Sequence, residues 1–128
     1  MQCALTVPLL EESFKVIKAW GFTYKTVAFT WVKRCKKNTG SFHVGMGHWT
    51  RANAEICLFA VKGRPKRVSK SVRQIIDSPI EAHSKKPEEA RDKILRLIGD
   101  IPRVELFARQ TTPGWDVWGN EVECDITF

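Results

Sequence analysis

The sequence predicts an α/β protein built as three layers, with helices on both faces of a sheet. Strand-like and helix-like segments alternate along the 128 residues, and this length is typical of one domain. The run from Thr23 to Val32 is almost continuously β-branched, apolar or aromatic, which is typical of an interior parallel strand covered on both faces. Polar clusters follow the C-terminal strand-like segments, where open α/β sheets bind ligands.

The first half begins with an apolar, strand-like segment, Cys3 to Val7. Nothing precedes this strand to neighbour it, so we expect the sheet to be N-terminally incomplete. A helix is expected after Pro8, ending at Gly21, where a left-handed cap costs little. Its apolar residues recur at helical spacing: Leu10, Phe14, Ile17 and Trp20. The next elements expected are the Thr23 to Val32 strand, a loop over 33–50 and a strand from Glu55 to Val61.

The second half alternates in the same way. The elements expected there are a basic loop from Gly63 to Arg73, a short strand from Gln74 to Ile76, a helix from Pro87 to Ile98, and strands from Val104 to Phe107 and from Val122 to Phe128.

Charge and cysteine usage indicate the class of partner and the compartment. The net charge of +7 favours a polyanionic partner, although charge bears on association rather than fold. The four cysteines are widely spaced with no C-x-x-C, so no metal site is expected and free thiols in a reducing compartment are favoured. The sequence has no apolar window of membrane-spanning length and no secretory signal pattern, so a cytoplasmic protein is expected.

Two segments carry features of nucleic-acid binding. Six cations without an acidic residue can follow phosphates, although a solvated loop explains them equally well: Lys62, Arg64, Lys66, Arg67, Lys70 and Arg73. Upstream, Trp49 and Arg51 combine an aromatic platform with a cation, which suits stacking on an extruded base. The neighbouring His48 is more simply interpreted as a structural residue.

Other polar residues stand where a small ligand would bind. Lys85 and Lys86 precede Pro87 at an expected helix start, where the helix dipole disfavours cations. They can therefore serve an anionic ligand group, or they form a solvated pair. Arg109 follows a strand, and its guanidinium can bind a carboxylate or hydroxyls, or it is a surface arginine. Asn120 and Glu121 can likewise bind a ligand or form a turn.

Seven motifs in order give the chain a specific resemblance. It resembles the adenine N(6)-methyltransferase family that includes the catalytic subunit of the messenger-RNA adenosine methyltransferase and bacterial and phage DNA-modifying relatives. The resemblance covers Cys3 to Glu121, through Ala19-Trp20-Gly21-Phe22, Phe29-Thr30-Trp31-Val32-Lys33, Gly47-His48-Trp49, Glu55 to Gly63, His83-Ser84-Lys85-Lys86-Pro87, Glu105 to Arg109, and Gly114-Trp115 with Gly119-Asn120-Glu121.

The resemblance implies a Rossmann-like methyltransferase that moves a methyl group from S-adenosylmethionine to the exocyclic amine of adenine in a nucleic acid, with DNA preferred over RNA as the partner. It implies cofactor contacts for Lys86, Arg109, Asn120 and Glu121. Substrate contacts are expected at Glu55 and the Trp49–Arg51 segment, and on the basic loop at Lys66, Arg67 and Lys70. No metal is expected.

The chain departs from the family at one motif. Relatives carry Asp-Pro-Pro-Trp before the segment that matches Cys3 to Val7, and this sequence does not contain it. We therefore assign no catalytic residue and interpret residues 1–128 as a single, partial S-adenosylmethionine-dependent methyltransferase domain, inactive alone. A longer reading frame or a second chain would complete it. The alternative is a non-catalytic, nucleic-acid-binding remnant or pseudoenzyme.

Overall fold

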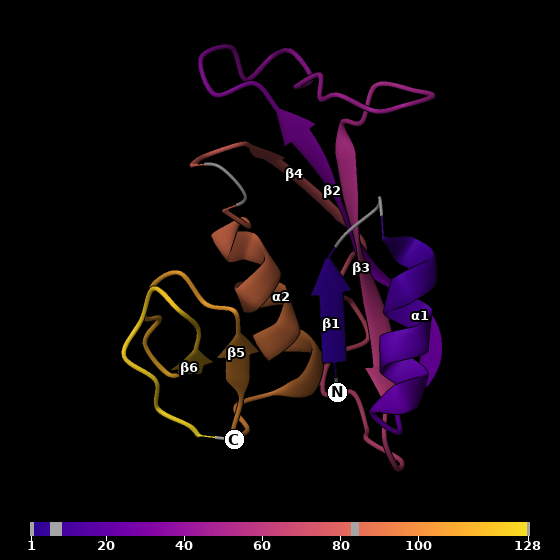
Figure 1. The fold of residues 1–128 in the computed structure, drawn as a ribbon, viewed down its shortest axis with the longest axis vertical. Helices are drawn as coiled ribbons and strands as arrows, with labels where there is room; N and C mark the ends of the chain where they lie inside the picture. Colours follow the sequence, from indigo (N-terminus) through magenta and orange to yellow (C-terminus); the bar gives the residue numbers. More distant parts are fainter. Residues whose placement is uncertain (1, 6–8, 83–84, 128) are drawn as a thin grey trace. The chain divides into compact units, whose positions relative to one another are not determined.

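The computed structural model describes residues 2–5, 9–82 and 85–127 (Figure 1). The chain forms two compact units, Met1–Ile98 and Gly99–Phe128, which are described separately as the first and second unit. The expectation of one partial domain over residues 1–128 stays a prediction.

The first unit contains a four-stranded mixed sheet and two helices. Its elements are β1 (Gln2–Leu5), α1 (Leu10–Ala19), β2 (Thr23–Arg34), β3 (Ala54–Val61), β4 (Ile75–Pro79) and α2 (Glu88–Ile98). The strand order is β1-β3-β2-β4; β3 is antiparallel to both neighbours, while β2 and β4 are parallel. The carboxyl ends of β2 and β4 therefore lie at the same edge of the sheet as the amino end of β3. We call this edge the carboxyl edge.

The two helices pack on opposite faces of this sheet, as Figure 1 shows. Successive residues of a strand point to opposite faces, so β3 contributes to two separate cores. Cys57 lies in a cluster with Phe29, Trp31, Ile76 and Ala90 of α2. The next residue, Leu58, lies in a cluster with Ala60 and Ile17 of α1. The α/β class is therefore confirmed, whereas the Rossmann-like three-layer arrangement stays a prediction.

α1 carries the residues expected of its ends, but its buried face is narrower than its apolar pattern predicts. α1 has Glu11 and Glu12 in its first turn and Lys18 in its last, and Gly21 follows it with a φ of +78°. Of its apolar stripe only Ile17 is buried, while Phe14 packs edge-on against Tyr24 with ring centroids 4.9 Å apart. The apolar periodicity therefore identified the helix correctly but overstated how much of the stripe is covered.

A buried lysine joins α2 to the sheet. Only 4% of Lys93 is exposed, and its ammonium donates hydrogen bonds of 2.7 and 2.9 Å to the backbone carbonyls of Arg73 and Ile75. These bonds hold the helix against the chain that enters β4, and they satisfy a charge that would otherwise be costly to bury.

The second unit contains a parallel two-stranded sheet, β5 (Val104–Leu106) and β6 (Asp116–Trp118). Val117 is fully buried. Its backbone N–H donates to the Asp125 carboxylate at 2.9 Å, and the Asp125 N–H donates back to the Val117 carbonyl at 3.0 Å. The chain after β6 therefore folds back as irregular structure rather than as a strand.

Two expectations about strands need correction. A strand from Val122 to Phe128 is wrong over 122–127, because the Asp125 contacts hold this segment in a turn. β6 lies earlier, between the two strands expected in this part of the chain. β2 is an interior strand, but it is parallel only to β4, since residue pattern reports burial and not strand direction. The expectations placed on Thr6, Val7, His83, Ser84 and Phe128 lie outside the described residues.

The cysteines differ in state. Cys35 and Cys124 are free thiols, whereas Cys57 is disulfide-bonded, contrary to the expectation for all four. Strand pairing, which spacing does not reveal, decides which cysteines meet. The cytoplasmic location stays a prediction. In the part of the chain that the structure describes, the helices are 10 and 11 residues long and neither is able to cross a membrane.

Candidate functional site

A cluster of charged side chains lies at the carboxyl edge of the first unit. β2 ends there with Lys33 and Arg34, and β3 begins there with Ala54 and Glu55. The strand register pairs Glu55 with Trp31, two residues before Lys33. Residues i and i+2 of a strand share one face, so Lys33 lies diagonally across from Glu55 on the same face of the sheet.

Glu55 is held between two lysines. The Lys33 ammonium lies 2.7 Å from Oε1 of Glu55, and the Lys86 ammonium lies 2.6 Å from Oε2. The side chains are 20%, 29% and 17% exposed for Lys33, Lys86 and Glu55 respectively. Both carboxylate oxygens thus accept charge-assisted hydrogen bonds in a partly desolvated place, and the cluster as a whole carries one net positive charge.

The two lysines keep Glu55 ionised. Burial by itself raises the pKa of this carboxyl, but the hydrogen bonds from Lys33 and Lys86 outweigh burial and hold the pKa below its ordinary value of 4.5. Glu55 is therefore an anionic hydrogen-bond acceptor at neutral pH, and its position is fixed by two donors.

A cavity of about 360 Å³ opens beside this cluster. Its lining combines aromatic, cationic and anionic groups: Trp31, Lys33, His43, Glu55, Ile80, Glu81, Ala82 and Lys85. The buried Trp31 is fixed by a 2.9 Å hydrogen bond from its indole N–H to the Ser78 carbonyl, and Lys85 pairs with Glu81 at 2.6 Å. The cavity is of ordinary size for a small polar ligand, with donors and acceptors on its walls.

Arg34 secures the base of the loop between β2 and β3. Its guanidinium donates two hydrogen bonds, of 2.7 and 2.8 Å, to the Asp77 carboxylate, and it lies 4.1 Å from the centre of the Phe42 ring. The hydrogen bond from Arg34 lowers the pKa of Asp77. The His43 N–H donates to the Lys33 carbonyl at 2.8 Å, which joins the two strands of chain at the base of the loop, and His43 also lines the cavity.

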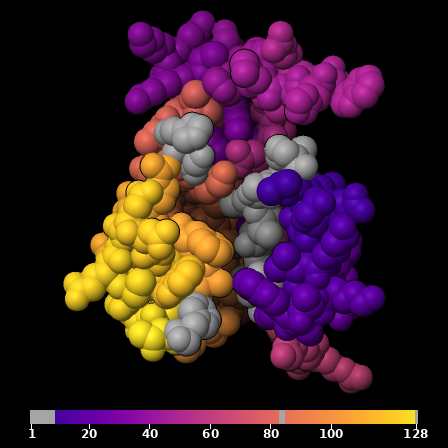
Figure 2. Space-filling view, viewed as in Figure 1, coloured from indigo at the N-terminus to yellow at the C-terminus, as the bar shows by residue number. Residues whose placement is uncertain are grey.

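The far part of this loop is exposed. The loop, residues 35–53, is seen at one end of the first unit in Figure 2. The Trp49 side chain is 99% exposed, and Arg51 is exposed as well. A Cβ on Gly47 would lie 2.0 Å from the Thr50 carbonyl, so this tight turn requires glycine. The structure does not bring Trp49 or Arg51 to Glu55.

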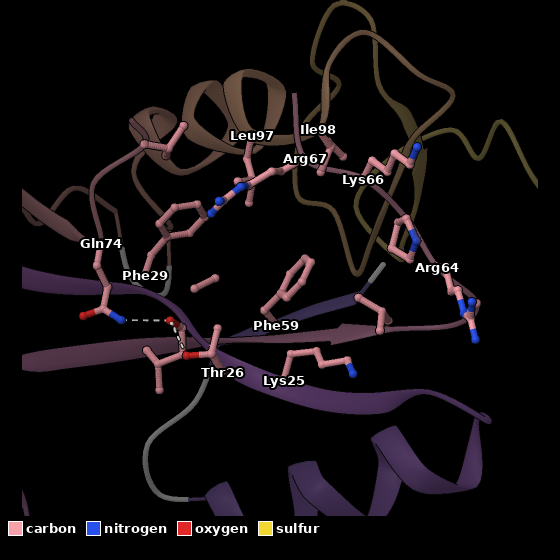
Figure 3. Close-up of a pocket in the computed structure, with 16 residues that line it drawn as sticks. Lys25, Thr26, Phe29, Phe59, Arg64, Lys66, Arg67, Gln74, Leu97 and Ile98 are labelled. Atoms are coloured by element: carbon pink, nitrogen blue, oxygen red, sulfur yellow. Dashed lines mark hydrogen bonds between the residues drawn. The ribbon is translucent and has the colours of Figure 1, made fainter. Parts of the chain in front are cut away.

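The basic loop lies elsewhere in the first unit. Lys66, Arg67 and Lys70 are all exposed, and Lys66 and Arg67 line a second cavity, beside the first half of β2 (Figure 3). The sequence predicted the charge of this loop but not the cavity beside it, which is formed partly by residues of β2, β3 and α2.

Three of the four expected cofactor residues lie in the second unit. Arg109 follows β5 and Asn120 and Glu121 follow β6, so the parallel strands carry them to the same end of their sheet. Arg109 Nε lies 3.3 Å from a carboxylate oxygen of Glu121. A Cβ on Gly119 would lie 2.4 Å from the Ala108 carbonyl, so glycine is what lets the two strand ends approach. Lys86 is in the first unit and contacts Glu55 instead.

Two candidate residues were missed by sequence reasoning. Lys33 ends a motif of the resemblance, but only the strand pairing shows that it meets Glu55. Phe107, at the end of β5, has a φ of +58° and is 73% exposed, and its ring stands edge-on to Trp118. A left-handed phenylalanine is strained, and such strain gathers at ligand sites. Nothing in the sequence around Phe107 signals this conformation.

Metal chemistry has no candidate among the residues that the structure describes, where no group of three or more metal-binding side chains occurs. The groups present in the described site are suited to recognition by hydrogen bonds and charge: an ionised carboxylate that accepts from N–H groups, beside ammonium groups that bind anions.

Comparison with known proteins gives the family. The MT-A70 family profile matches residues 6–121, and this chain belongs to the MT-A70 family. It is 34% identical over 119 residues to the type II methyltransferase M.MunI of Mycoplasma sp, which covers 91% of this chain and 48% of that protein. The chain thus spans about half the length of this relative.

Two adenosine methyltransferases match over nearly the same span. The N(6)-adenosine-methyltransferase MT-A70-like protein of Drosophila melanogaster is 29% identical over 117 residues, which is 89% of this chain and 19% of that protein. The catalytic subunit of the human N(6)-adenosine-methyltransferase is 27% identical over 117 residues, covering 89% and 20% of the two chains.

Proposed function

We propose that this chain is part of an S-adenosylmethionine-dependent nucleic-acid adenine N(6)-methyltransferase and that it transfers no methyl group alone. The observation that supports the proposal most is the Lys33–Glu55–Lys86 cluster at the carboxyl edge of the sheet, in a chain of the MT-A70 family. On this proposal, the four-stranded sheet is the part of a Rossmann-like methyltransferase sheet that faces the substrate.

Glu55 suits recognition of adenine. The exocyclic amine of adenine offers two N–H donors, and an ionised carboxylate is an acceptor for them. Lys33 and Lys86 fix the Glu55 oxygens, so an amine bound there would be held in one orientation. Orientation of the attacking nitrogen is a large part of the rate enhancement in such a transfer. The exposed Trp49 and Arg51 would contact the nucleic acid from the neighbouring loop.

The residues of the second unit fit part of the cofactor. S-adenosylmethionine, when bound, supplies a methyl group on a positively charged sulfur. Glu121 can accept hydrogen bonds from the ribose hydroxyls, Arg109 and Asn120 can donate and orient, and the exposed Phe107 offers an aromatic face. Lys86 has three donor hydrogens, so it can bind the methionine carboxylate as well as Glu55.

We infer DNA rather than RNA as the nucleic acid. Adenosine is a ribonucleoside, and the relatives named for it are between 27% and 31% identical to this chain, against 34% for the type II methyltransferase. The net charge of +7 and the exposed cations of the basic loop, Lys66, Arg67 and Lys70, support a polyanionic partner of either kind.

A second function is supported by a different observation. The sequence lacks Asp-Pro-Pro-Trp while it keeps the basic loop, and this combination suits a non-catalytic protein that binds nucleic acid. The two functions differ in whether a longer reading frame or a second chain restores transfer.

Transfer of a tritiated methyl group from S-adenosylmethionine to adenine-containing duplex DNA separates them. We expect no incorporation by the 128-residue chain and incorporation once a segment carrying Asp-Pro-Pro-Trp is supplied. In that complete enzyme Glu55→Gln should lower the rate strongly, while Glu11→Gln, on the exposed surface of α1, should not. If the 128-residue chain alone incorporates methyl groups and Arg109→Ala abolishes this incorporation, the chain is active and the proposed inactivity is wrong. Failure of the completed protein to methylate would favour the non-catalytic function.

A further inference from the structure

All residues that line the cavity beside the basic loop belong to the first unit, and Glu55 is not among them. The cavity measures about 640 Å³. Lys25 to Phe29 of β2 and Phe59 and Val61 of β3 contribute to one wall, whereas Glu55 lies at the opposite end of β3. The remaining wall comes from the basic loop and from the end of α2, through Leu97 and Ile98 (Figure 3).

The interior of this cavity is apolar and aromatic. Phe29 is almost fully buried, and Phe59 is partly exposed. In Figure 3 the Phe59 ring projects from β3 into the cavity, toward the side on which Leu97 and Ile98 lie. A flat ligand that entered the cavity would therefore meet an aromatic face on the sheet and aliphatic side chains on the helix.

The rim of the cavity is cationic. Lys25, Arg64, Lys66 and Arg67 are exposed lining residues; in Figure 3 the Arg67 side chain extends toward Phe29, whereas Arg64 and Lys66 lie on the other side of Phe59. None of the lining residues is acidic, and none of these four side chains has an ion-pair or hydrogen-bond partner among the described residues. Four uncompensated cations beside an aromatic wall complement a ligand that has a flat apolar body and an attached anion.

We propose that this cavity binds one nucleotide of a single-stranded segment of nucleic acid, with its base on Phe59 and its phosphate on a cationic side chain of the basic loop. Cavities of about 300–1,000 Å³ commonly hold small ligands, and stacking of a base on an aromatic side chain tolerates any sequence. Guanidinium groups bind phosphate through paired donors. The nucleotide held here differs from any adenine at Glu55, which lies at the other end of β3. The proposal rests on the nucleic-acid substrate proposed above.

The test uses the isotope-labelled 128-residue chain and two small probes observed by NMR. Thymidine 5′-monophosphate, which contains no adenine, should shift the resonances of Phe59, Leu97 and Ile98. Deoxyribose 5-phosphate, which lacks the base, should shift them far less. Phe59→Leu should weaken thymidine monophosphate binding by about fivefold or more, the loss expected for one base–aromatic stack. Phe14→Leu, a partly exposed phenylalanine on α1, is the matched control and should leave binding unchanged.

An octamer of thymidylate identifies the source of the nucleotide. We expect it to displace the mononucleotide and to shift the same residues. If the mononucleotide binds but the octamer does not displace it, the cavity does not bind a nucleotide of single-stranded nucleic acid, and the proposal is wrong on this point. If neither thymidine monophosphate nor the octamer shifts the resonances of the cavity residues at several millimolar, the cavity is not the binding site. The same conclusion follows if Phe59→Leu binds thymidine monophosphate as tightly as the wild type does. Salt-dependent octamer binding with unshifted cavity residues would contradict this proposal alone, whereas absence of octamer binding would contradict the nucleic-acid function.

Discussion

The ammonium of Lys86 lies 2.6 Å from Oε2 of Glu55, although 31 residues separate them in the sequence. Lys86 stands just before α2, where the helix dipole disfavours a cation, and the Glu55 carboxylate compensates its charge. In the proposed function, Lys86 contacts the cofactor and Glu55 contacts the adenine. Their contact would link the two parts of the site directly through a hydrogen bond.

The lowered pKa of Glu55 predicts an acid-dependent contribution to stability. Because the folded pKa lies below the unfolded value, the contribution is present above that unfolded value and is lost as pH falls through the folded pKa. Glu55→Gln should lower the free energy of unfolding by about 1.5–3 kcal/mol near neutral pH. The difference from the wild type should shrink below about pH 4.5. Urea unfolding across this pH range measures both effects.

The control for this experiment is Glu11→Gln. Glu11 is 84% exposed and lies 3.8 Å from Lys15, so its removal should change stability little at any pH. A constant difference between the wild type and Glu55→Gln from neutral to acidic pH would show that Glu55 does not titrate as the two lysines require.

We predict that Arg34 anchors the loop formed by residues 35–53. Arg34→Lys keeps the charge but loses the paired hydrogen bonds to Asp77 and the planar contact with Phe42. The amide of His43, bonded to the carbonyl next to Arg34, should then exchange its hydrogen several times faster. Hydrogen–deuterium exchange measures this rate. Arg51→Lys, an exposed arginine of the same loop, is the matched control, and equal exchange in the two variants would exclude the anchoring role.

The sequence allowed the long elements of the first unit to be predicted, whereas β4, expected from Gln74 to Ile76, runs from Ile75 to Pro79. The Thr23 to Val32 run and the two helices were identified, because each repeats its period several times. β6 was missed because it stands between Gly114 and Gly119, which indicate turns, and the Val117–Asp125 contacts that shape the following segment are tertiary. The expected strand from Val122 had only local composition to support it.

The candidate site also has features that the sequence predicted and features that it did not. The polar residues at the ends of strands were named from the sequence, and Arg109 and Glu121 do meet. The contact of Glu55 with Lys33 was not predictable, because it depends on the antiparallel register between β2 and β3. Residue type alone likewise gave no sign of the left-handed backbone at Phe107. Pairing between distant segments decides these features, and a single sequence does not display it.

The exposed lysines of the basic loop predict a salt-dependent affinity for duplex DNA. Each phosphate neutralised contributes about 0.9 to the slope of log affinity against log salt. Replacing Lys66 and Lys70 with Ala should therefore reduce the slope by about two. Fluorescence anisotropy with a labelled duplex at several salt concentrations measures the slope. Replacing Lys15 and Lys18 of α1 removes the same charge elsewhere and is the matched control. Equal slopes for the two double variants would show that the basic loop is a solvated surface.

The Arg109–Glu121 pair predicts that the chain retains weak affinity for the cofactor. Arg109, Asn120 and Glu121 follow two parallel strands that end side by side, so part of a binding surface is already formed. With the Asp-Pro-Pro-Trp segment absent, we expect millimolar rather than micromolar binding of S-adenosylhomocysteine, a loss of about 4 kcal/mol. Ligand-observed NMR measures it. Arg109→Ala and Asn120→Ala should each weaken binding, while Arg96→Ala, an exposed arginine of α2, should not. If a folded sample shows no binding at several millimolar, or if Arg109→Ala and Asn120→Ala bind as the wild type does, these residues do not form a cofactor site in this chain.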